Sequence, residues 1–390
     1  MSGRHRWIAP VVAFTLVVGV VATAFGRPDP AEAATPPASQ YTPTVLPGLI
    51  AGGRCTLDAV TADGTMVGDA VDASSQAVAV VRPPGATSFT ALGVPAGMDS
   101  VNPTGANALG DLVGDATSTS PPPFGSQIAV VYQGGTWVNV NATVGPPQAI
   151  IVRAVNDSRI AVGSAEGFVA GLPSPIRWDL VADSWQIVPG MAAIGGQAAD
   201  INDAGQIAGS RLTAPQRAFF YDPASNTTTD SPTLGGATAG AMAISSDGFV
   251  AGDSATAGGA THPFLWDPAT NQMTDLGLPP GATGAVAIDV NSSHQVVGFF
   301  DTAGGEGGAF LWDPVNGMQV LAPPTGTIGP YAAAINDAGL IVGSALNPSD
   351  EVPQCAVWTP PAPPPTTSST VPAPPTSAVT PAVVTPSFTG

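Results

Sequence analysis

The chain has 390 residues and a net charge of −18, with 47 glycines, 42 prolines and no lysine. A surface of this sign repels phosphate backbones and anionic lipid, which argues against nucleic acid as a partner.

The N-terminal residues are typical of a secretory signal. Arg4 and Arg6 precede an apolar run, residues 7–25, and Ala31-Glu32-Ala33 has the small-x-small form of a cleavage site. The run is close to the length of about 20 residues that spans a bilayer, so an uncleaved anchor is the alternative. Pro10 and the cleavage site favour removal of residues 1–33. No later segment is apolar for long enough to cross a membrane, and we expect a secreted protein, associated with the cell wall or free.

A short pattern recurs seven times along the rest of the chain. Its clearest copy, residues 335–343, reads Ile-Asn-Asp-Ala-Gly-Leu-Ile-Val-Gly. A period of about 45 residues with strand-like patterning predicts a β-propeller with seven blades. The final glycines of the seven copies are Gly68, Gly114, Gly163, Gly209, Gly252, Gly298 and Gly343.

Each repeat contains four short strand-like segments separated by turn residues. In the sixth repeat they are residues 285–290, 295–300, 308–312 and 318–321. Short β-rich runs bounded by Gly, Asn, Asp and Pro predict hairpins, so we expect an all-β domain over residues 41–360. Residues 34–40 form a short leader. Residues 361–390 are rich in Pro, Thr and Ser, which predicts a disordered tail.

Two elements recur within the repeats. Asn-Asp-x-Gly, at 202–205 and 336–339, is interpreted as a tight turn rather than a calcium site, because no copy has the ligand spacing of an EF-hand. The second element is an aromatic strand followed by Asp-Pro, as in residues 308–314. We interpret its rings as packing between blades rather than as platforms for sugars.

Together these two elements resemble the bacterial HAF-type extracellular repeats, which pair a His-Ala-Phe-Leu-Trp strand with an Ile-Asn-Asp-x-Gly-x-Val-Val-Gly hairpin. The resemblance covers roughly residues 41–360 and is strongest in the last four repeats. The His-Ala-Phe triplet itself is absent, since Arg217, His262 and Gly308 occupy its first position. The resemblance implies an exported repeat protein, and it supplies no reaction.

The ends of the repeat array predict how the ring closes. The seventh repeat lacks a fourth strand, and an orphan strand-like segment, residues 41–47, precedes the first repeat. We expect this segment to complete the last blade, with pairing from Thr44 onward or with Pro43 facing out. Cys55 and Cys355 then lie at one seam, and we expect a disulfide between them in an oxidising compartment.

The remaining residues argue against several kinds of catalysis. Past residue 33 the chain has two histidines, His262 and His294, and no Gly-x-Ser-x-Gly elbow, which disfavours a Ser-His-Asp hydrolase. A carboxylate-dependent glycosidase needs only an acidic pair and stays open as the alternative. We therefore expect a monomeric, non-enzymatic binding or scaffold module with no cofactor, although a divalent cation is conceivable. Its expected partner is an envelope polysaccharide or an extracellular protein.

One face of the predicted propeller is the better candidate for binding. The second connection of each blade varies from repeat to repeat, whereas the first and third are repeated turns, and variable loops on a rigid frame usually carry function. We expect the acidic residues of these loops to form the ligand face, with Asp301, Glu306, Asp350 and Glu351 as its main candidates. Simple solvation of these charges is the alternative. The other charged residues of this face are Asp69, Asp72, Asp115, Glu166, Asp253 and Arg211.

Overall fold

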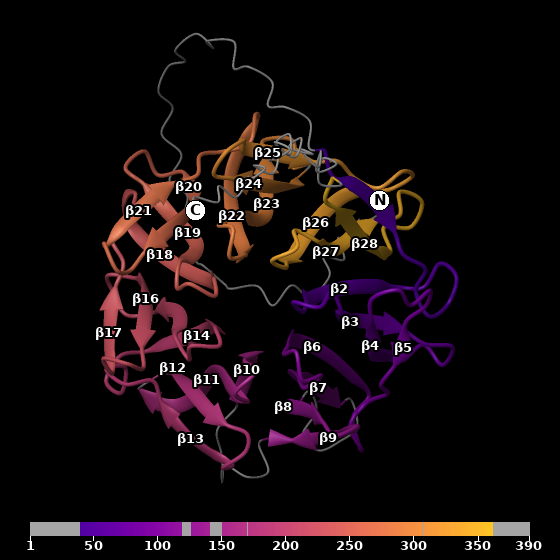
Figure 1. Cartoon of the computed structure of the whole chain (residues 1–390), viewed down its shortest axis with the longest axis horizontal. Helices are drawn as coiled ribbons and strands as arrows, with labels where there is room; N and C mark the ends of the chain where they lie inside the picture. The colour runs from indigo at the N-terminus through magenta and orange to yellow at the C-terminus, as the bar shows by residue number, and fades with distance from the viewer. Residues whose placement is uncertain (1–39, 119–125, 141–149, 170, 306, 362–390) are drawn as a thin grey trace, which may run out of the picture. The chain divides into compact units, whose positions relative to one another are not determined.

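The computed structural model describes residues 40–118, 126–140, 150–169, 171–305 and 307–361. Seven four-stranded antiparallel sheets form a ring, as in a seven-bladed β-propeller (Figure 1). In chain order the first six blades contain β2(Cys55–Val60) to β5(Thr90–Ala91), β6(Ser100–Ala106) to β9(Thr136–Asn139), β10(Ile150–Val155) to β13(Ser184–Ile187), β14(Gly196–Ile201) to β17(Thr227–Asp230), β18(Gly235–Ile244) to β21(Gln272–Asp275), and β22(Ala282–Val290) to β25(Gly317–Leu321).

The intervening strands of these six blades complete each sheet in sequence order, so the first strand is innermost and the fourth is outermost. They are β3(Met66–Val71), β4(Ala77–Arg82), β7(Leu112–Ser118), β8(Ser126–Gln133), β11(Ile160–Val169), β12(Leu172–Asp179), β15(Ile207–Arg211), β16(Arg217–Asp222), β19(Val250–Thr256), β20(Thr261–Asp267), β23(Val296–Thr302) and β24(Gly308–Asp313). The described residues contain no α-helix, which confirms the all-β prediction. No membrane-spanning helix is found in the described part of the chain.

The seventh blade closes the ring with a strand from the other end of the chain. It consists of β26(Ile328–Ile335), β27(Ile341–Leu346), β28(Pro353–Thr359) and, outermost, β1(Thr42–Val45). The ladder pairs Thr42 with Thr359 and Val45 with Ala356, and the amide of Leu46 donates to the carbonyl of Cys355 at 2.8 Å. Closure by residues 41–47 is thus confirmed, with the ladder extending back past Pro43 to Thr42.

The predicted disulfide is present where the first and last blades meet. Cys55, the first residue of β2, is bonded to Cys355 in β28, with 4.9 Å between the Cα atoms and 300 residues of separation in sequence. Both cysteines are buried in a cluster shared by the first and last blades. The bond therefore links the two blades that the chain itself joins only through β1.

The repeated glycine is explained by a bulge that the innermost strand of every blade contains. In blade six the register shifts between Ala287 and Asp289, opposite Gly298. A Cβ atom on Gly298 would lie 2.0 Å from the carbonyl oxygen of Val286, so no side chain fits there. The other six repeat glycines face a first-strand carbonyl in the same way, at 1.9 to 2.3 Å from an added Cβ. The bulge thus fixes glycine at this position.

The aromatic strands fill the core, as predicted. Phe219, Phe264 and Phe310, at equivalent positions in the third strands, have no exposed surface, nor do Trp266 and Trp358. They belong to clusters that combine residues of adjacent blades. The rings therefore serve blade-to-blade packing and are not available as sugar platforms.

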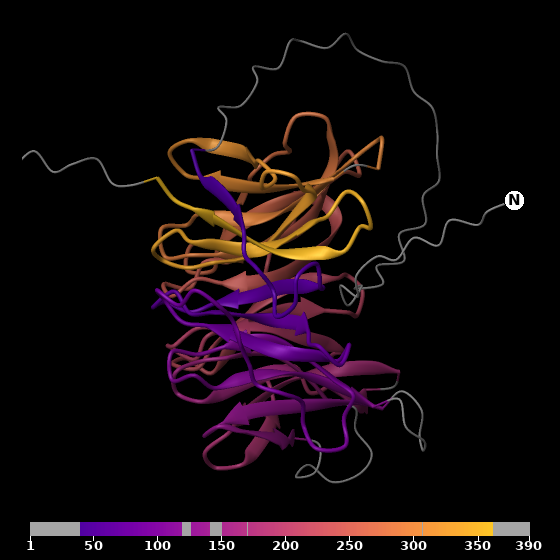
Figure 2. The ribbon, with the colours of Figure 1, turned by 90° about the vertical axis from the view of Figure 1, so that its right-hand side faces the viewer.

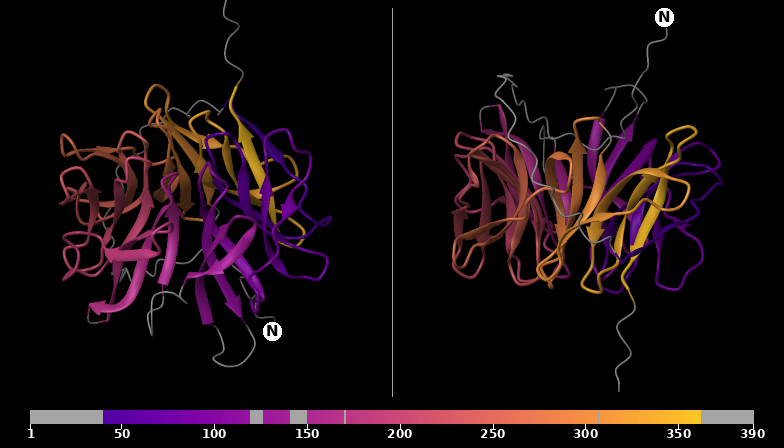
Figure 3. Two further views of the ribbon diagram at one scale, coloured as in Figure 1. Left: turned by 60° about the horizontal axis from the view of Figure 1, so that its bottom comes forward. Right: turned by 90° about the horizontal axis from the view of Figure 1, so that it is seen from above.

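The strands run between two faces of the ring, seen edge-on in Figure 2 and in the right half of Figure 3, and obliquely in its left half. One face carries the first and third connections of each blade, such as residues 202–206 and 223–226, and we call it the turn face. The other carries the second connections and the links between blades, such as residues 212–216 and 257–260, and we call it the loop face.

Candidate functional site

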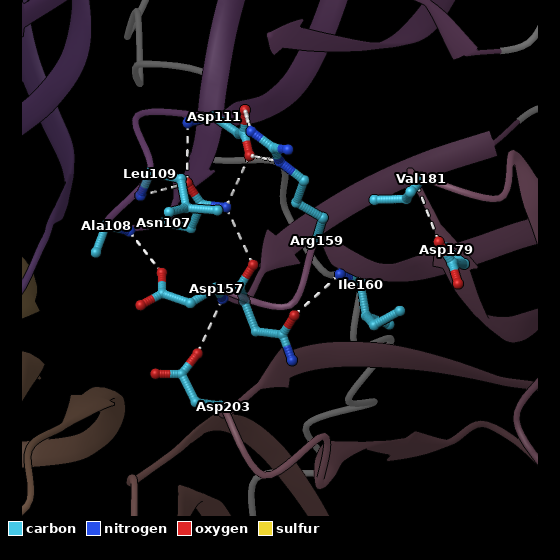
Figure 4. Close-up of polar contacts among 11 residues, drawn as sticks. Asn107, Ala108, Leu109, Asp111, Asp157, Arg159, Ile160, Asp179, Val181 and Asp203 are labelled. Carbon is cyan, nitrogen blue, oxygen red and sulfur yellow. Dashed lines mark hydrogen bonds and ion pairs between the residues drawn. The ribbon is translucent and has the colours of Figure 1, made fainter.

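On the turn face, the predicted Asn-Asp-x-Gly turns are confirmed, and they also join neighbouring blades. Gly205 and Gly339 have positive φ angles of 76° and 80°, as such turns require. In addition, the side-chain amide of Asn107 donates to the carbonyl of Asn156 in the next blade at 3.1 Å (Figure 4). The same contact recurs from Asn156 to Asn202, Asn202 to Ser245, Asn291 to Asn336 and, across the seam, Asn336 to Thr61. Sequence reasoning assigned this asparagine to its own turn alone and missed the inter-blade bond.

The aspartates of the turn face are occupied by backbone amides. Asp157 accepts from the amide of Ala108 at 2.7 Å, and Asp203 accepts from the amide of Asp157 at 2.9 Å (Figure 4). In the third connections, Asp179 and Asp313 accept amide hydrogen bonds from residues two and three positions later. These carboxylates stabilise the turns, which leaves them poorly placed to bind a ligand.

The loop face contains a cavity of about 570 Å³ at the inner ends of blades four to seven. This volume lies in the range of small-ligand sites. The walls are mostly apolar, from Ala239, Met242, Val286 and Ile288 on the innermost strands of blades five and six. The polar and charged lining residues are Ser210, Arg211, Gln216, Thr238, Asp253, Thr261, Thr283, Asp301 and Tyr331.

Asp253 is a half-buried carboxyl in the wall of this cavity. It follows the repeat glycine Gly252 in β19, opposite Gly240. Burial raises the pKa of its carboxyl to about 6, and the hydrogen bond that opposes this shift comes from its own backbone amide. Among the described residues, no other group donates a hydrogen bond or forms an ion pair with the Asp253 side chain. An ionised carboxylate here lacks an ion-pair partner in the part of the chain that the structure describes.

Two aromatic rings form another part of the wall. Phe299 in β23 and Tyr331 in β26 have ring centroids 5.6 Å apart and planes inclined by 35°. Burial, followed by the negative charge of Asp58, raises the pKa of Tyr331 to about 12, so its hydroxyl stays neutral. The cavity thus combines a carboxylate, apolar strands and the faces or edges of two rings.

The four main residues predicted for the ligand face separate in the structure. Asp301 is exposed at the end of β23 and lines the cavity with Asp253. Asp350 and Glu351 are exposed in the turn between β27 and β28, where Asp350 accepts from the amide of Val352, and they are not among the lining residues. Glu306 lies outside the described residues. The structure therefore places one of the four at the cavity.

Three half-buried aspartates lie on the innermost strands, and sequence reasoning overlooked them. Asp200 accepts hydrogen bonds from the backbone amides of Ile201 and, in the following blade, Ile244. Asp289 accepts them in the same way from Val290 and, in the following blade, Ile335. Burial raises the pKa of Asp200 to about 6 and that of Asp289 to about 7. Burial also raises the pKa of Asp58, whose Oδ2 atom is buried without a partner in the structure.

In the part of the chain that the structure describes, no group of three or more His, Cys, Asp or Glu side chains converges. The cavity's two carboxylates alone do not make the oxygen-rich shell that calcium takes.

Asp253 was among the loop-face residues named from sequence but was not singled out. A signal for it exists in the alignment of the repeats. The residue after the repeat glycine is an aspartate in blades one, two and five, where it is Asp69, Asp115 and Asp253. It is serine in three other blades and Phe299 in blade six. The sequence alone does not tell which of the three acids lacks an internal partner, because the partners come from other strands.

Comparison with solved structures finds the same fold at low sequence identity. Oligogalacturonate lyase in complex with manganese matches with a TM-score of 0.54 at 10% identity, covering 84% of this chain and 99% of that chain. YCF48 bound to D1 peptide matches with a TM-score of 0.50 at 12% identity, covering 84% and 98%. TolB from Acinetobacter baumannii gives 0.39 at 9% identity, covering 80% and 65%, so the chain spans less than two thirds of TolB. No protein-family model and no curated protein matches.

Proposed function

We propose that this protein is a secreted or cell-envelope-associated binding module of the HAF-repeat type, without catalytic activity, whose ligand site is the loop-face cavity. The observation that carries the proposal is the cavity of about 570 Å³ with the unpaired carboxylate of Asp253 in its wall. The signal-like N-terminus and the disulfide support export, because such bonds persist in oxidising compartments.

The frame suits this role because it holds the cavity rigidly. The inter-blade asparagine bonds and the closed seventh blade fix the innermost strands, so a ligand need not order them on binding. The solved structures with a similar fold include a lyase and a protein bound to a peptide, so they favour neither catalysis nor peptide binding for this chain.

A second candidate rests on the pair of carboxylates in the cavity. Asp253, with its pKa raised to about 6, has the property of a general acid, and Asp301 lines the same space. This is the residue pair that a glycosidase would require. Release of reducing sugar from an envelope polysaccharide, lost in both Asp253→Asn and Asp301→Asn, would favour this alternative over binding without turnover.

The test of the proposed site is a variant that fills the cavity without touching its charges. Gly284 lines the cavity, and an added Cβ there meets its nearest atom, the carbonyl oxygen of Thr261, at 3.6 Å, so Gly284→Leu should fold and block the space. Gly304→Leu, on the same face but outside the lining, is the matched control. We expect retention on purified envelope fractions to fall at least tenfold for Gly284→Leu and to persist for Gly304→Leu. Equal retention of both variants would refute the cavity as the site.

A further inference from the structure

The three aspartates that follow a repeat glycine provide an internal comparison. Asp69 forms an ion pair with Arg54 and accepts a hydrogen bond from the hydroxyl of Thr56. Asp115 acts electrostatically on Arg153, where it opposes the lowering of the guanidinium pKa by burial. Two of these three equivalent carboxylates therefore interact with a cation of the protein, while none of the described residues forms an ion pair with Asp253.

The cation near Asp115 can be traced to one position. Arg153 is the bulged residue of β10, in the blade that follows Asp115, because the register shifts between Val152 and Ala154. The corresponding bulged residue in the blade that follows Asp253 is Ile288, which lines the cavity. Blade six thus supplies an apolar side chain where blade three supplies a guanidinium.

Other charges near the cavity do not fill this role. Arg211 lines it, but its guanidinium forms an ion pair with Asp230. Arg217 donates to the backbone carbonyls of Gln216 and Ala237. His262, in the strand next to β19, is paired with Asp275 at 2.9 Å. None of these three side chains is a cause of the pKa shift of Asp253, which burial dominates.

We propose that the cavity binds an organic cation, the ammonium or guanidinium end of a lysine or arginine side chain on a protein partner, with the charge at Asp253 and the stem along the apolar wall. This rests on the cavity being the ligand site. Met242, Val286 and Ile288 offer surface to the methylene groups of such a side chain. The rings of Phe299 and Tyr331 add cation–π attraction. Among the described residues no third His, Cys, Asp or Glu side chain joins the two carboxylates to hold a divalent ion, and a neutral sugar would leave the carboxylate without a counter-charge.

Charge favours an external source for this side chain. The chain has a net charge of −18 and no lysine, so it attracts basic partners and offers no lysine of its own to the cavity. The acidic Asp301 at the same cavity adds to this attraction.

The experiment is calorimetric titration of the full chain with N-acetyl-lysine methylamide and N-acetyl-arginine methylamide, with the uncharged norleucine analogue as the control ligand. We expect either charged probe to bind at least tenfold more tightly than norleucine. Asp253→Asn should remove that difference, and Ile288→Arg should remove it as well by supplying the cation internally. Binding should increase as pH rises from 5 to 7, also in His262→Gln, which excludes that histidine as the cause.

Failure of this inference can be distinguished from failure of the cavity as a site. Equal binding of all three probes, or binding unaffected by Asp253→Asn, would overturn the assignment of a cation. The assignment of a cation is also overturned if no probe binds while Gly284→Leu still abolishes envelope retention, because the cavity then binds another ligand. If Gly284→Leu leaves retention unchanged, the proposed function fails first.

Discussion

The side-chain amide of Asn202 lies 3.0 Å from the carbonyl oxygen of Ser245, and this bond ties blade four to blade five. The Oδ1 atom of Asn202 also accepts from the amide of Gln206 within its own turn. One asparagine therefore closes a hairpin and joins two blades. Asn202→Ala should lower the free energy of unfolding by about 1 to 3 kcal/mol, because it leaves buried backbone groups without partners. Denaturant unfolding checks this, and an unchanged midpoint would contradict it.

The same relationship predicts a stabilising change. At the next step of the ring Ser245 replaces asparagine, and its hydroxyl bonds Asp247 and the amide of Phe249. Ser245→Asn should keep the bond to Phe249 and add one to the carbonyl of Asn291, raising stability by about 0.5 to 1.5 kcal/mol. Thermal unfolding beside Ser246→Asn, one residue along the same turn, checks the gain. A lower melting temperature of Ser245→Asn would contradict the idea that an asparagine at this position can form the missing bond between blades five and six.

The repeat glycines should be intolerant of even one added carbon. Gly298→Ala would place a Cβ atom 2.0 Å from the carbonyl oxygen of Val286, so the bulge must move. We expect a loss of more than about 2 kcal/mol, against little change for Gly304→Ala, where an added Cβ meets nothing closer than 4.0 Å. Equal stability of the two variants would refute the role of the bulge.

The disulfide should contribute mainly by restricting the unfolded chain. It spans 300 residues of sequence, so the chain-entropy estimate gives a stabilisation of about 6 kcal/mol. Cys55→Ser with Cys355→Ser should unfold at lower denaturant concentration, and a reducing agent should shift the wild-type protein to the same midpoint. A reducing agent that left the wild-type midpoint unchanged would contradict the prediction.

Stability should decrease as pH rises from about 4 to 8. Asp58, Asp200 and Asp289 have pKa values above the ordinary 3.8, with Asp289 at about 7. A carboxyl whose pKa is higher in the folded state stabilises the fold when protonated, and that stabilisation is lost as pH rises through the folded value. Melting temperatures across this range test the sign. Asp58→Asn should flatten the profile, whereas Glu166→Gln, at an exposed residue, should not.

Much of the fold follows from local chemistry that the sequence displays. The unpaired segment containing Val45 and the incomplete last repeat predict closure, and closure predicts the pairing of Cys55 with Cys355. The bulges, the inter-blade asparagine bonds and the cavity depend on how neighbouring strands lie against one another. Asp253 looks like Asp69 and Asp115 in the sequence, and only the positions of Arg54 and Arg153 distinguish them.

Photo-cross-linking tests the central claim, that the loop-face cavity is the ligand site, most directly. Benzoylphenylalanine is introduced in the full chain at Gln216, which lines the cavity, or at Val315, which is 88% exposed in a third connection on the turn face. Each variant is irradiated with envelope fractions. We expect a discrete cross-linked species for the Gln216 variant and none for the Val315 variant. Cross-linking at Val315 alone, or equally at both positions, would contradict it.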